Sequence, residues 1–251
     1  MLEIKNIWKT FNANTVNEKV ALRGVSLTLN DGDFVTVIGG NGAGKSTLMN
    51  AVAGVYPVDR GSITIDGVDV THLPEHKRAQ FIGRVIEENL ALAARRGQTR
   101  GLRSGITKAE REEYRELLKI LGLGLEDRLT AKVGLLSGGQ RQALTLLMAT
   151  LKKPKLLLLD EHTAALDPKT AAKVLDTTET IVQRDKLTTL MITHNMRDAI
   201  AHGNRLIMMY EGKIAIDVYG EEKKKLTVES LLGMFSKVSG STEADDKLLL
   251  S

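Results

Sequence analysis

Residues 39–47 read Gly-Gly-Asn-Gly-Ala-Gly-Lys-Ser-Thr and match the phosphate-loop pattern G-x-x-x-x-G-K-[ST] in full. Glycines let the backbone N–H groups of such a loop converge on one point, where a following helix adds the positive end of its dipole. We expect Lys45 to reach the β and γ phosphates, Ser46 to bind Mg²⁺ and Thr47 to bind an inner phosphate. The loop residues expected to contact a polyphosphate are Gly39, Asn41, Gly42, Ala43, Gly44, Lys45, Ser46 and Thr47.

A pair of carboxylates follows a second apolar run. Four consecutive leucines at 156–159 lead directly into Asp160 and Glu161. Open α/β sheets bind ligands at the carboxyl ends of their strands, which is also where the phosphate loop is expected. Asp160 is suited to hold Mg²⁺, and Glu161 is suited to polarise a water for in-line attack on a γ-phosphorus. Adjacent acidic residues are common on surfaces, so this interpretation depends on the phosphate loop.

A third motif opens an apolar helical stretch with Ser137, Gly138, Gly139 and Gln140. The serine is a good helix cap, and the free N–H groups of a helix start bind anions. An ordinary capped helix would explain Ser137, but it would leave the two glycines lowering helix stability without any return. We therefore expect a second anion site here.

The elements that must position these groups form an α/β pattern. Phe34–Ile38 has the continuously apolar, β-branched character of a buried parallel strand, and residues from Ser46 onward can continue as a helix. Helical stretches such as 170–184 alternate with later strand signals, which indicates a parallel sheet flanked by helices. These later strand signals lie at 156–159, 188–193 and 205–209.

Two other parts of the chain have a different character. The first third is rich in strand signals, and the Asp66-Gly67 pair within 63–70 predicts a tight hairpin, so we expect a small antiparallel sheet beside the phosphate loop. Residues 86–127 are charge-rich and helical in pattern, with the apolar residues of 108–122 on one face. This stretch predicts an inserted helical subdomain.

Composition limits the class of protein. Of 251 residues, 42% are hydrophobic and 26% charged, which is ordinary for a globular protein. The net charge of +4 suits anionic ligands but does not by itself indicate nucleic acid, and we expect no nucleic-acid partner. The chain has no cysteine, which excludes disulfides and thiolate metal sites. It lacks a signal-peptide pattern and an apolar run of about 18 residues, so we expect a cytoplasmic protein whose membrane role requires a partner.

With Leu166 and Asp167, these motifs resemble those of the nucleotide-binding subunit of ATP-binding cassette (ABC) transporters, over nearly the whole chain and in the family's order. The resemblance implies a P-loop NTPase (RecA-like) α/β core with an N-terminal antiparallel β subdomain and an inserted α-helical subdomain. We expect one ABC ATPase domain over 1–251. Its core would comprise 1–85 and 131–235, its helical subdomain 86–130 and a flexible tail 236–251.

The resemblance also assigns roles to single residues. His194 matches the histidine that contacts the γ-phosphate, and Phe11 matches the aromatic that stacks on adenine, with Val20 as an expected neighbour. The family implies ATP and Mg²⁺ as cofactors and a head-to-tail homodimer. Each ATP would lie between the Lys45 loop of one subunit and Ser137, Gly138, Gly139 and Gln140 of the other, with Asp167 nearby.

The sequence departs from the family pattern in two places. His162 stands where the family usually has proline, and we interpret it as a loop residue without a catalytic role. The strand expected at Phe81–Val85 should lead into a glutamine loop, but residues 86–90 already resemble the next helix, and Gln80 precedes the strand. A natural deletion, an engineered deletion or a mobile loop omitted from this sequence would each produce such a junction, and we favour the last.

The function implied is an ATP-hydrolysing subunit on the inner face of the cell membrane that drives integral-membrane permease subunits. Import is the first expectation, with a separate solute-binding protein, and the run from Asp160 to Pro168 is similar to that of a subgroup associated with amino-acid-like solutes. Two alternatives stay open. One is a soluble ABC ATPase that acts as a cytosolic assembly factor of the iron–sulfur cluster type, and the other is an exporter.

Overall fold

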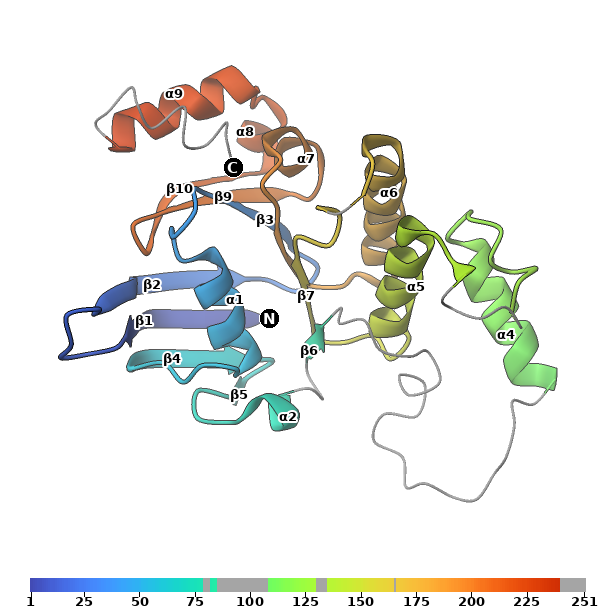
Figure 1. Cartoon of the computed structure of the whole chain (residues 1–251), viewed down its shortest axis with the longest axis horizontal. Helices are drawn as coiled ribbons and strands as arrows, with labels where there is room; N and C mark the ends of the chain where they lie inside the picture. The colour runs from blue at the N-terminus through green and yellow to red at the C-terminus, as the bar shows by residue number, and fades with distance from the viewer. Residues whose placement is uncertain (79–81, 85–107, 130–134, 165, 240–251) are drawn as a thin grey trace. The chain divides into compact units, whose positions relative to one another are not determined.

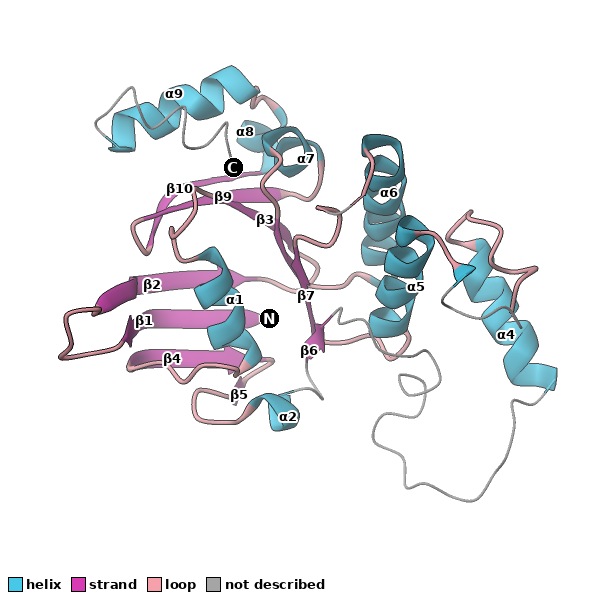
Figure 2. Ribbon diagram, viewed as in Figure 1, coloured by secondary structure: helices cyan, strands magenta, loops and turns pink. Residues whose placement is uncertain are grey.

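The computed structural model describes residues 1–78, 82–84, 108–129, 135–164 and 166–239 (Figure 1). Its contacts divide the chain into two compact units. The first comprises 1–84, 154–161 and 186–251, and the second comprises 85–153 and 162–185. Figure 2 shows that the first unit contains the described strands together with several helices, whereas the described elements of the second unit are helices. None of the described helices is both long and apolar enough to cross a bilayer.

One sheet of the first unit is antiparallel, with the strand order β2-β1-β4-β5. Asp66 and Gly67 both have positive φ, 52° and 78°, as a two-residue hairpin turn between β4 and β5 requires. The expected antiparallel sheet and its Asp-Gly hairpin are therefore confirmed. The strands are β1 (Leu2–Phe11), β2 (Lys19–Leu29), β4 (Arg60–Ile65) and β5 (Val68–Asp69).

The other sheet has the order β10-β9-β3-β8-β7-β6 and is parallel from β9 to β6, whereas β10 runs antiparallel to β9. Every residue of β3 is buried, as its apolar sequence predicts. The α/β parallel sheet expected from the sequence is confirmed. Its strands are β3 (Phe34–Ile38), β6 (Ile82–Arg84), β7 (Leu156–Asp160), β8 (Thr189–Ile192), β9 (Arg205–Tyr210) and β10 (Lys213–Tyr219).

Helix α1 (Lys45–Ala53) packs between these two sheets (Figure 1). Leu48 and Val52 of α1 share one core cluster with Ile63 of the antiparallel sheet and with Val37 and Leu158 of the parallel sheet. The helix that follows the phosphate loop is thus held by apolar contacts on both sides.

Among the described helices, three cover the other face of the parallel sheet, namely α7 (Met196–Ala201), α8 (Gly220–Lys224) and α9 (Val228–Ser239). Phe235 of α9 is buried and its ring packs edge-on against Tyr210, with centroids 5.4 Å apart. Helix α9 extends to Ser239, so 236–239, which we expected to belong to a flexible tail, are helical.

A buried arginine binds the backbone carbonyls at the carboxyl end of α1. The Arg78 guanidinium, on α2 (Glu75–Arg78), donates to the carbonyls of Ala51 and Val52 at 2.8 and 2.9 Å, and also to those of Leu73 and Thr71 at 2.7 and 2.9 Å. Burial lowers the pKa of Arg78, and Asp69 partly opposes this effect. Because the positive charge lies at the negative end of the helix dipole, it stabilises the last turn of α1.

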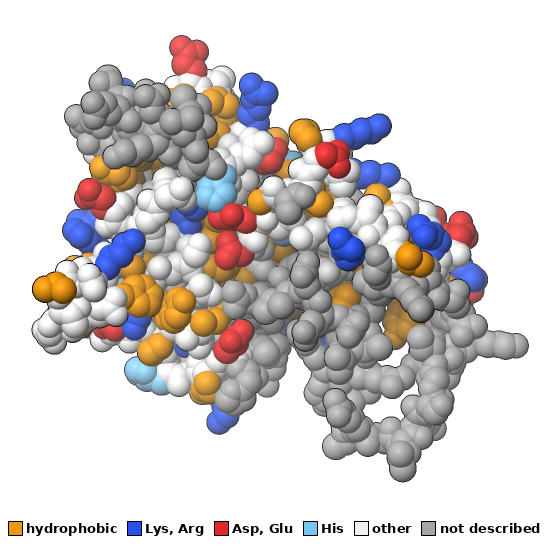
Figure 3. Space-filling view, in the orientation of Figure 1, with side chains coloured by type: hydrophobic (Ala, Val, Ile, Leu, Met, Phe, Trp, Pro, Cys, Tyr) orange, Lys and Arg blue, Asp and Glu red, His pale blue; other side chains and the backbone are white. Residues whose placement is uncertain are grey.

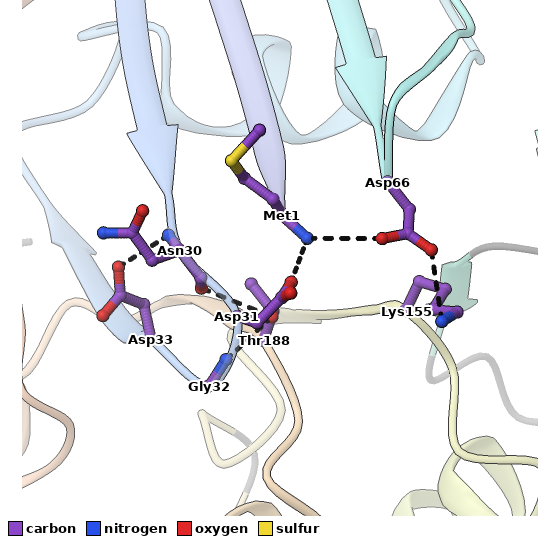
Figure 4. A network of polar contacts seen from close by, with 8 residues as sticks. All are labelled: Met1, Asn30, Asp31, Gly32, Asp33, Asp66, Lys155 and Thr188. Atoms are coloured by element: carbon purple, nitrogen blue, oxygen red, sulfur yellow. Dashed lines mark hydrogen bonds and ion pairs between the residues drawn. The ribbon is translucent and has the colours of Figure 1, made fainter.

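Polar contacts join the turns at the amino ends of the parallel strands (Figure 4). The Met1 amino group pairs with Asp31 and lies 3.9 Å from Asp66, whose other oxygen is 3.1 Å from Lys155 Nζ just before β7. The Gly32 N–H donates to Thr188 Oγ1 at 3.1 Å. The two sheets are therefore joined at the end opposite to the phosphate loop.

The second unit contains α4 (Lys108–Lys119), α5 (Gly138–Thr150) and α6 (Pro168–Asp185). Helices α5 and α6 pack against each other, and the turn after α4 is hydrogen-bonded to both. Gln140 Nε2 of α5 donates to the Leu123 carbonyl at 3.2 Å, and Lys173 Nζ of α6 donates to the Gly122 carbonyl at 2.6 Å. This unit thus includes α5 and α6 as well as part of the stretch 86–130.

Candidate active site

The phosphate loop connects β3 to α1 and depends on glycine at two close approaches. Gly39 has a φ of 145°, and a Cβ there would lie 2.3 Å from the Met209 carbonyl oxygen of β9. Gly44 has a φ of 103°, and its Cβ would lie 2.6 Å from the Ala21 carbonyl oxygen of β2. Only glycine accepts this backbone and this spacing, so the loop is fixed against a strand of each sheet.

Lys45 is folded back over its own loop. Its Nζ donates to the carbonyls of Gly39 at 2.7 Å and Gly40 at 3.3 Å, which leaves one of its three N–H donors for a ligand. Burial lowers the pKa of Lys45, whereas the negative charges of Glu161 and Asp160 partly restore it. The ammonium is therefore held in place before any phosphate arrives.

The loop opens onto a cavity of about 380 Å³. Its walls come from β1, β2, the phosphate loop and the segments after β7 and β8. The residues that line it are Phe11, Lys19, Ala21, Asn41, Gly42, Ala43, Gly44, Lys45, Ser46, Thr47, Glu161 and His194. The structure thus brings together the predicted phosphate, aromatic and catalytic residues of the first unit.

Glu161 and His194 contact each other at this cavity. His194 Nε2 lies 2.5 Å from Glu161 Oε1, while among the described residues His194 Nδ1 is buried without a hydrogen-bond partner. Glu161 has a φ of 47°, an uncommon conformation for a residue with a side chain. Its second carboxylate oxygen remains available to accept a proton from a water. Figure 3 draws one face of the molecule, on which a histidine side chain lies next to carboxylate side chains.

The aromatic end of the cavity is formed by Phe11. Its ring packs edge-on against Tyr56, with centroids 5.3 Å apart, and Lys9 Nζ lies 5.6 Å from the ring centroid. Lys9 is itself held by Asp59 at 3.2 Å. The ring is thus fixed in an orientation suited to stacking on a base.

Val20, the predicted neighbour of Phe11 in the site, does not line the cavity, but the residues on either side of it do. Lys19 and Ala21 line the cavity, whereas Val20 between them does not, because successive side chains of a strand point to opposite faces. Lys19 and Ala21 are therefore lining residues that the sequence analysis missed. Their position follows from the pairing of Phe11 with Lys19 across β1 and β2, which the sequence alone does not give.

The donors predicted for Mg²⁺ suit that ion. Ser46 is exposed at the cavity, and Asp160 ends β7 close enough to raise the pKa of Lys45. Hydroxyl and carboxylate oxygens are hard ligands, and Mg²⁺ usually takes only one or two of them from protein and the rest from water and phosphate. In the described parts of the chain, no three acidic or histidine side chains form a metal cluster.

In the second unit, Ser137 caps α5. Its Oγ accepts from the Gln140 N–H at 3.2 Å, and Gln140 Oε1 accepts from the Ser137 N–H at 3.1 Å, a complete capping box. Asp167 accepts from the Thr170 N–H at 3.1 Å, and this hydrogen bonding lowers the pKa of Asp167.

Gly139 has a structural use that the sequence analysis did not foresee. A Cβ at Gly139 would lie 2.0 Å from Thr170 Cγ2, so the absence of a side chain lets α5 approach α6 closely. Gly139 therefore contributes to the packing of α5 on α6, contrary to the expectation that both glycines only lower helix stability.

The close packing of Gly139 against Thr170 predicts how a substitution at Gly139 changes stability. Gly139→Ala should lower the free energy of unfolding by about 1–3 kcal/mol, because the added methyl overpacks against Thr170. The clash outweighs the roughly 0.5–1 kcal/mol that alanine gains over glycine in a helix. Urea denaturation followed by circular dichroism measures the change. Adding Thr170→Ala should recover most of the loss, and a double variant as unstable as Gly139→Ala would contradict the steric explanation.

The two departures from the family pattern are only partly described. His162 is buried, with Nε2 3.2 Å from Thr178 Oγ1 of α6, so it packs in the second unit. Strand β6 (Ile82–Arg84) confirms the strand expected at 81–85 over the part of it that the structure describes. Gln80, Val85, Ile86 and Ala165 lie outside the described residues.

Comparison with known proteins identifies the family of the chain. Residues 22–164 match the family model described as ABC transporter. A tyrosine transport ATP-binding protein from Clostridioides difficile (strain R20291) is 42% identical over 248 residues, which cover 94% of this chain and 98% of that protein. The spermidine/putrescine import ATP-binding protein PotA from Haemophilus ducreyi is 33% identical over 247 residues, which cover 93% of this chain and 63% of that longer protein.

A solved structure shows the same likeness. The dimeric post-hydrolysis state of the ATP-binding cassette MJ0796, bound to ADP and Pi, has a TM-score of 0.71 and 29% sequence identity. The match covers 87% of this chain and 98% of that one. The chain therefore belongs to the ABC transporter family and is a nucleotide-binding, ATP-hydrolysing subunit.

Proposed function

We propose that this chain hydrolyses Mg·ATP to power the import of an amino-acid-like solute through a separate membrane permease. The observation that supports the ATPase assignment is the contact between Glu161 and His194, whose Oε1 and Nε2 atoms are 2.5 Å apart. Both residues line the same cavity as Lys45. A carboxylate beside the phosphate loop is a base for the attacking water, and the histidine orients that carboxylate. Ser46 and Asp160 would hold Mg²⁺, whose charge would neutralise phosphate oxygens.

The active form in this proposal is a head-to-tail homodimer. Ser137 is exposed at the start of α5, and with Gly138, Gly139 and Gln140 it would bind the ATP held by the Lys45 loop of another copy. Asp167 would lie near that interface. The dimeric form of MJ0796 supports this arrangement.

The names of the relatives support the solute and the location that we propose. The protein from Clostridioides difficile acts in tyrosine transport by its name, and the match spans almost the whole of both chains. We therefore place this chain at the cytoplasmic face of the membrane, with a solute-binding protein delivering an amino acid, tyrosine being the first to test. An exporter or a soluble assembly factor has no such support.

The test is purification of the chain with its membrane partner, followed by reconstitution in vesicles. Tyrosine with the solute-binding protein should stimulate ATP hydrolysis and should accumulate on the side of the ATPase. A complex carrying Glu161→Gln is the matched control and should do neither. Solute movement away from the ATPase would indicate an exporter, and co-purification with soluble proteins alone would indicate an assembly factor.

A further inference from the structure

We propose that Lys19 is a second cation of the nucleotide site and binds the phosphate side of ATP together with Lys45. The proposal rests on the ATP site described above and adds a contact that the motifs do not assign. The observation behind it is an ammonium group that lines the cavity beside the phosphate loop.

The position of Lys19 follows from the strand pairing. Lys19 is the first residue of β2 and lies opposite Phe11, the last residue of β1. Its Nζ is 3.5 Å from the point where a Cβ of Gly42 would stand. The side chain therefore extends from the aromatic end of the cavity to the middle of the phosphate loop.

The ammonium group of Lys19 differs from those of Lys9 and Lys45, which pair with groups of the protein. Lys9, the other lysine near Phe11, pairs with Asp59, and Lys45 donates to the loop carbonyls. Among the described residues, no carboxylate or carbonyl pairs with the Lys19 ammonium. Within the described part of the chain, all three of its N–H donors are therefore open to a ligand, and the ligand of a phosphate loop is a polyanion.

The expected contribution is moderate, because Lys19 is exposed and water screens its charge. A unit charge about 4 Å from a phosphate in a water-like environment changes affinity by roughly fivefold to tenfold. The contact involves phosphate oxygens that are charged both before and during the reaction. Lys19 should therefore affect the KM for ATP and leave kcat almost unchanged.

The experiment compares the affinities of Lys19→Ala, Lys19→Arg and the unaltered chain for ATP, ADP and adenosine by titration calorimetry. Lys19→Ala should raise the Kd of ATP and ADP about fivefold to tenfold at low salt, with a smaller effect at high salt, and should leave adenosine binding unchanged. Lys19→Arg should keep most of the affinity. Lys225→Ala removes the same charge from an exposed position outside the cavity and should have no effect.

Two results would overturn the proposal. An unchanged Kd for ATP in Lys19→Ala would mean that the ammonium only contacts solvent. An equal loss for adenosine and ATP would mean that the side chain acts on the base or the ribose. In both cases the unaltered chain still binds ATP, whereas failure of the unaltered chain to bind ATP would contradict the proposed function itself.

Discussion

Glu161→Gln should lower the kcat for ATP by about 10²- to 10⁴-fold, because an amide cannot take the proton of the attacking water. The change preserves the shape of the side chain, and the amide oxygen could still accept a hydrogen bond from His194 Nε2, which lies 2.5 Å from Glu161 Oε1. ATP binding should therefore persist while turnover is lost, and the ATP-bound dimer should accumulate. Phosphate release measures the first effect, and analytical ultracentrifugation with ATP measures the second.

Glu222→Gln is the matched control, since Glu222 is exposed on α8 and does not line the cavity. It should leave kcat unchanged. Undiminished ATP hydrolysis by the Glu161→Gln variant would show that Glu161 is not the base. His194→Ala should also lower kcat, because it removes the group that holds the carboxylate.

Lys45→Ala should raise the Kd for ATP by about 10²- to 10³-fold, because a buried ammonium acts on the phosphates through a lower effective dielectric than an exposed one. Lys45 is only 6% exposed, and its ammonium is already aimed at the loop by the Gly39 and Gly40 carbonyls. Little entropy is therefore lost when ATP binds. Titration calorimetry with ATP measures the affinity.

Loss of Lys45 also leaves those two carbonyls without their donor, so folding must be checked separately by thermal denaturation. Lys45→Met keeps the length of the side chain and should lose ATP affinity to the same extent. The exposed Lys225→Ala should keep it. An unchanged ATP affinity in a folded Lys45→Met variant would mean that the assigned phosphate contact is wrong.

Much of the fold was predictable because its signals are local. The continuous apolar run of Phe34–Ile38 predicts that β3 is buried on both faces. The Asp66-Gly67 pair predicts a turn that needs positive φ at both positions. The phosphate loop carries its own geometry, since glycine spacing is the condition for its close approach to the strands. Each of these features depends on residues that are close together in the sequence, so each can be predicted from the sequence alone.

Features that depend on register between distant strands were harder to predict. The contact between Glu161 and His194 arises because β7 and β8 are parallel neighbours with Asp160 opposite Ile192. The sequence of neither strand indicates which strand lies next to it. Val20, the expected neighbour of Phe11, does not line the cavity for the same reason, because the pairing of β2 with β1 decides which residues of β2 face it. The closeness of Gly139 to Thr170 likewise depends on how α5 and α6 pack.

The hydrogen bonds of Arg78 have a consequence for how the chain opens. One guanidinium holds carbonyls from the end of α1 and from the segment that includes Thr71 and Leu73. Neither segment can separate without leaving a buried charge unpaired, which is costly. The two should therefore unfold together as one cooperative unit, so that amide hydrogens of 49–53 and of 71–78 exchange with solvent at a common rate.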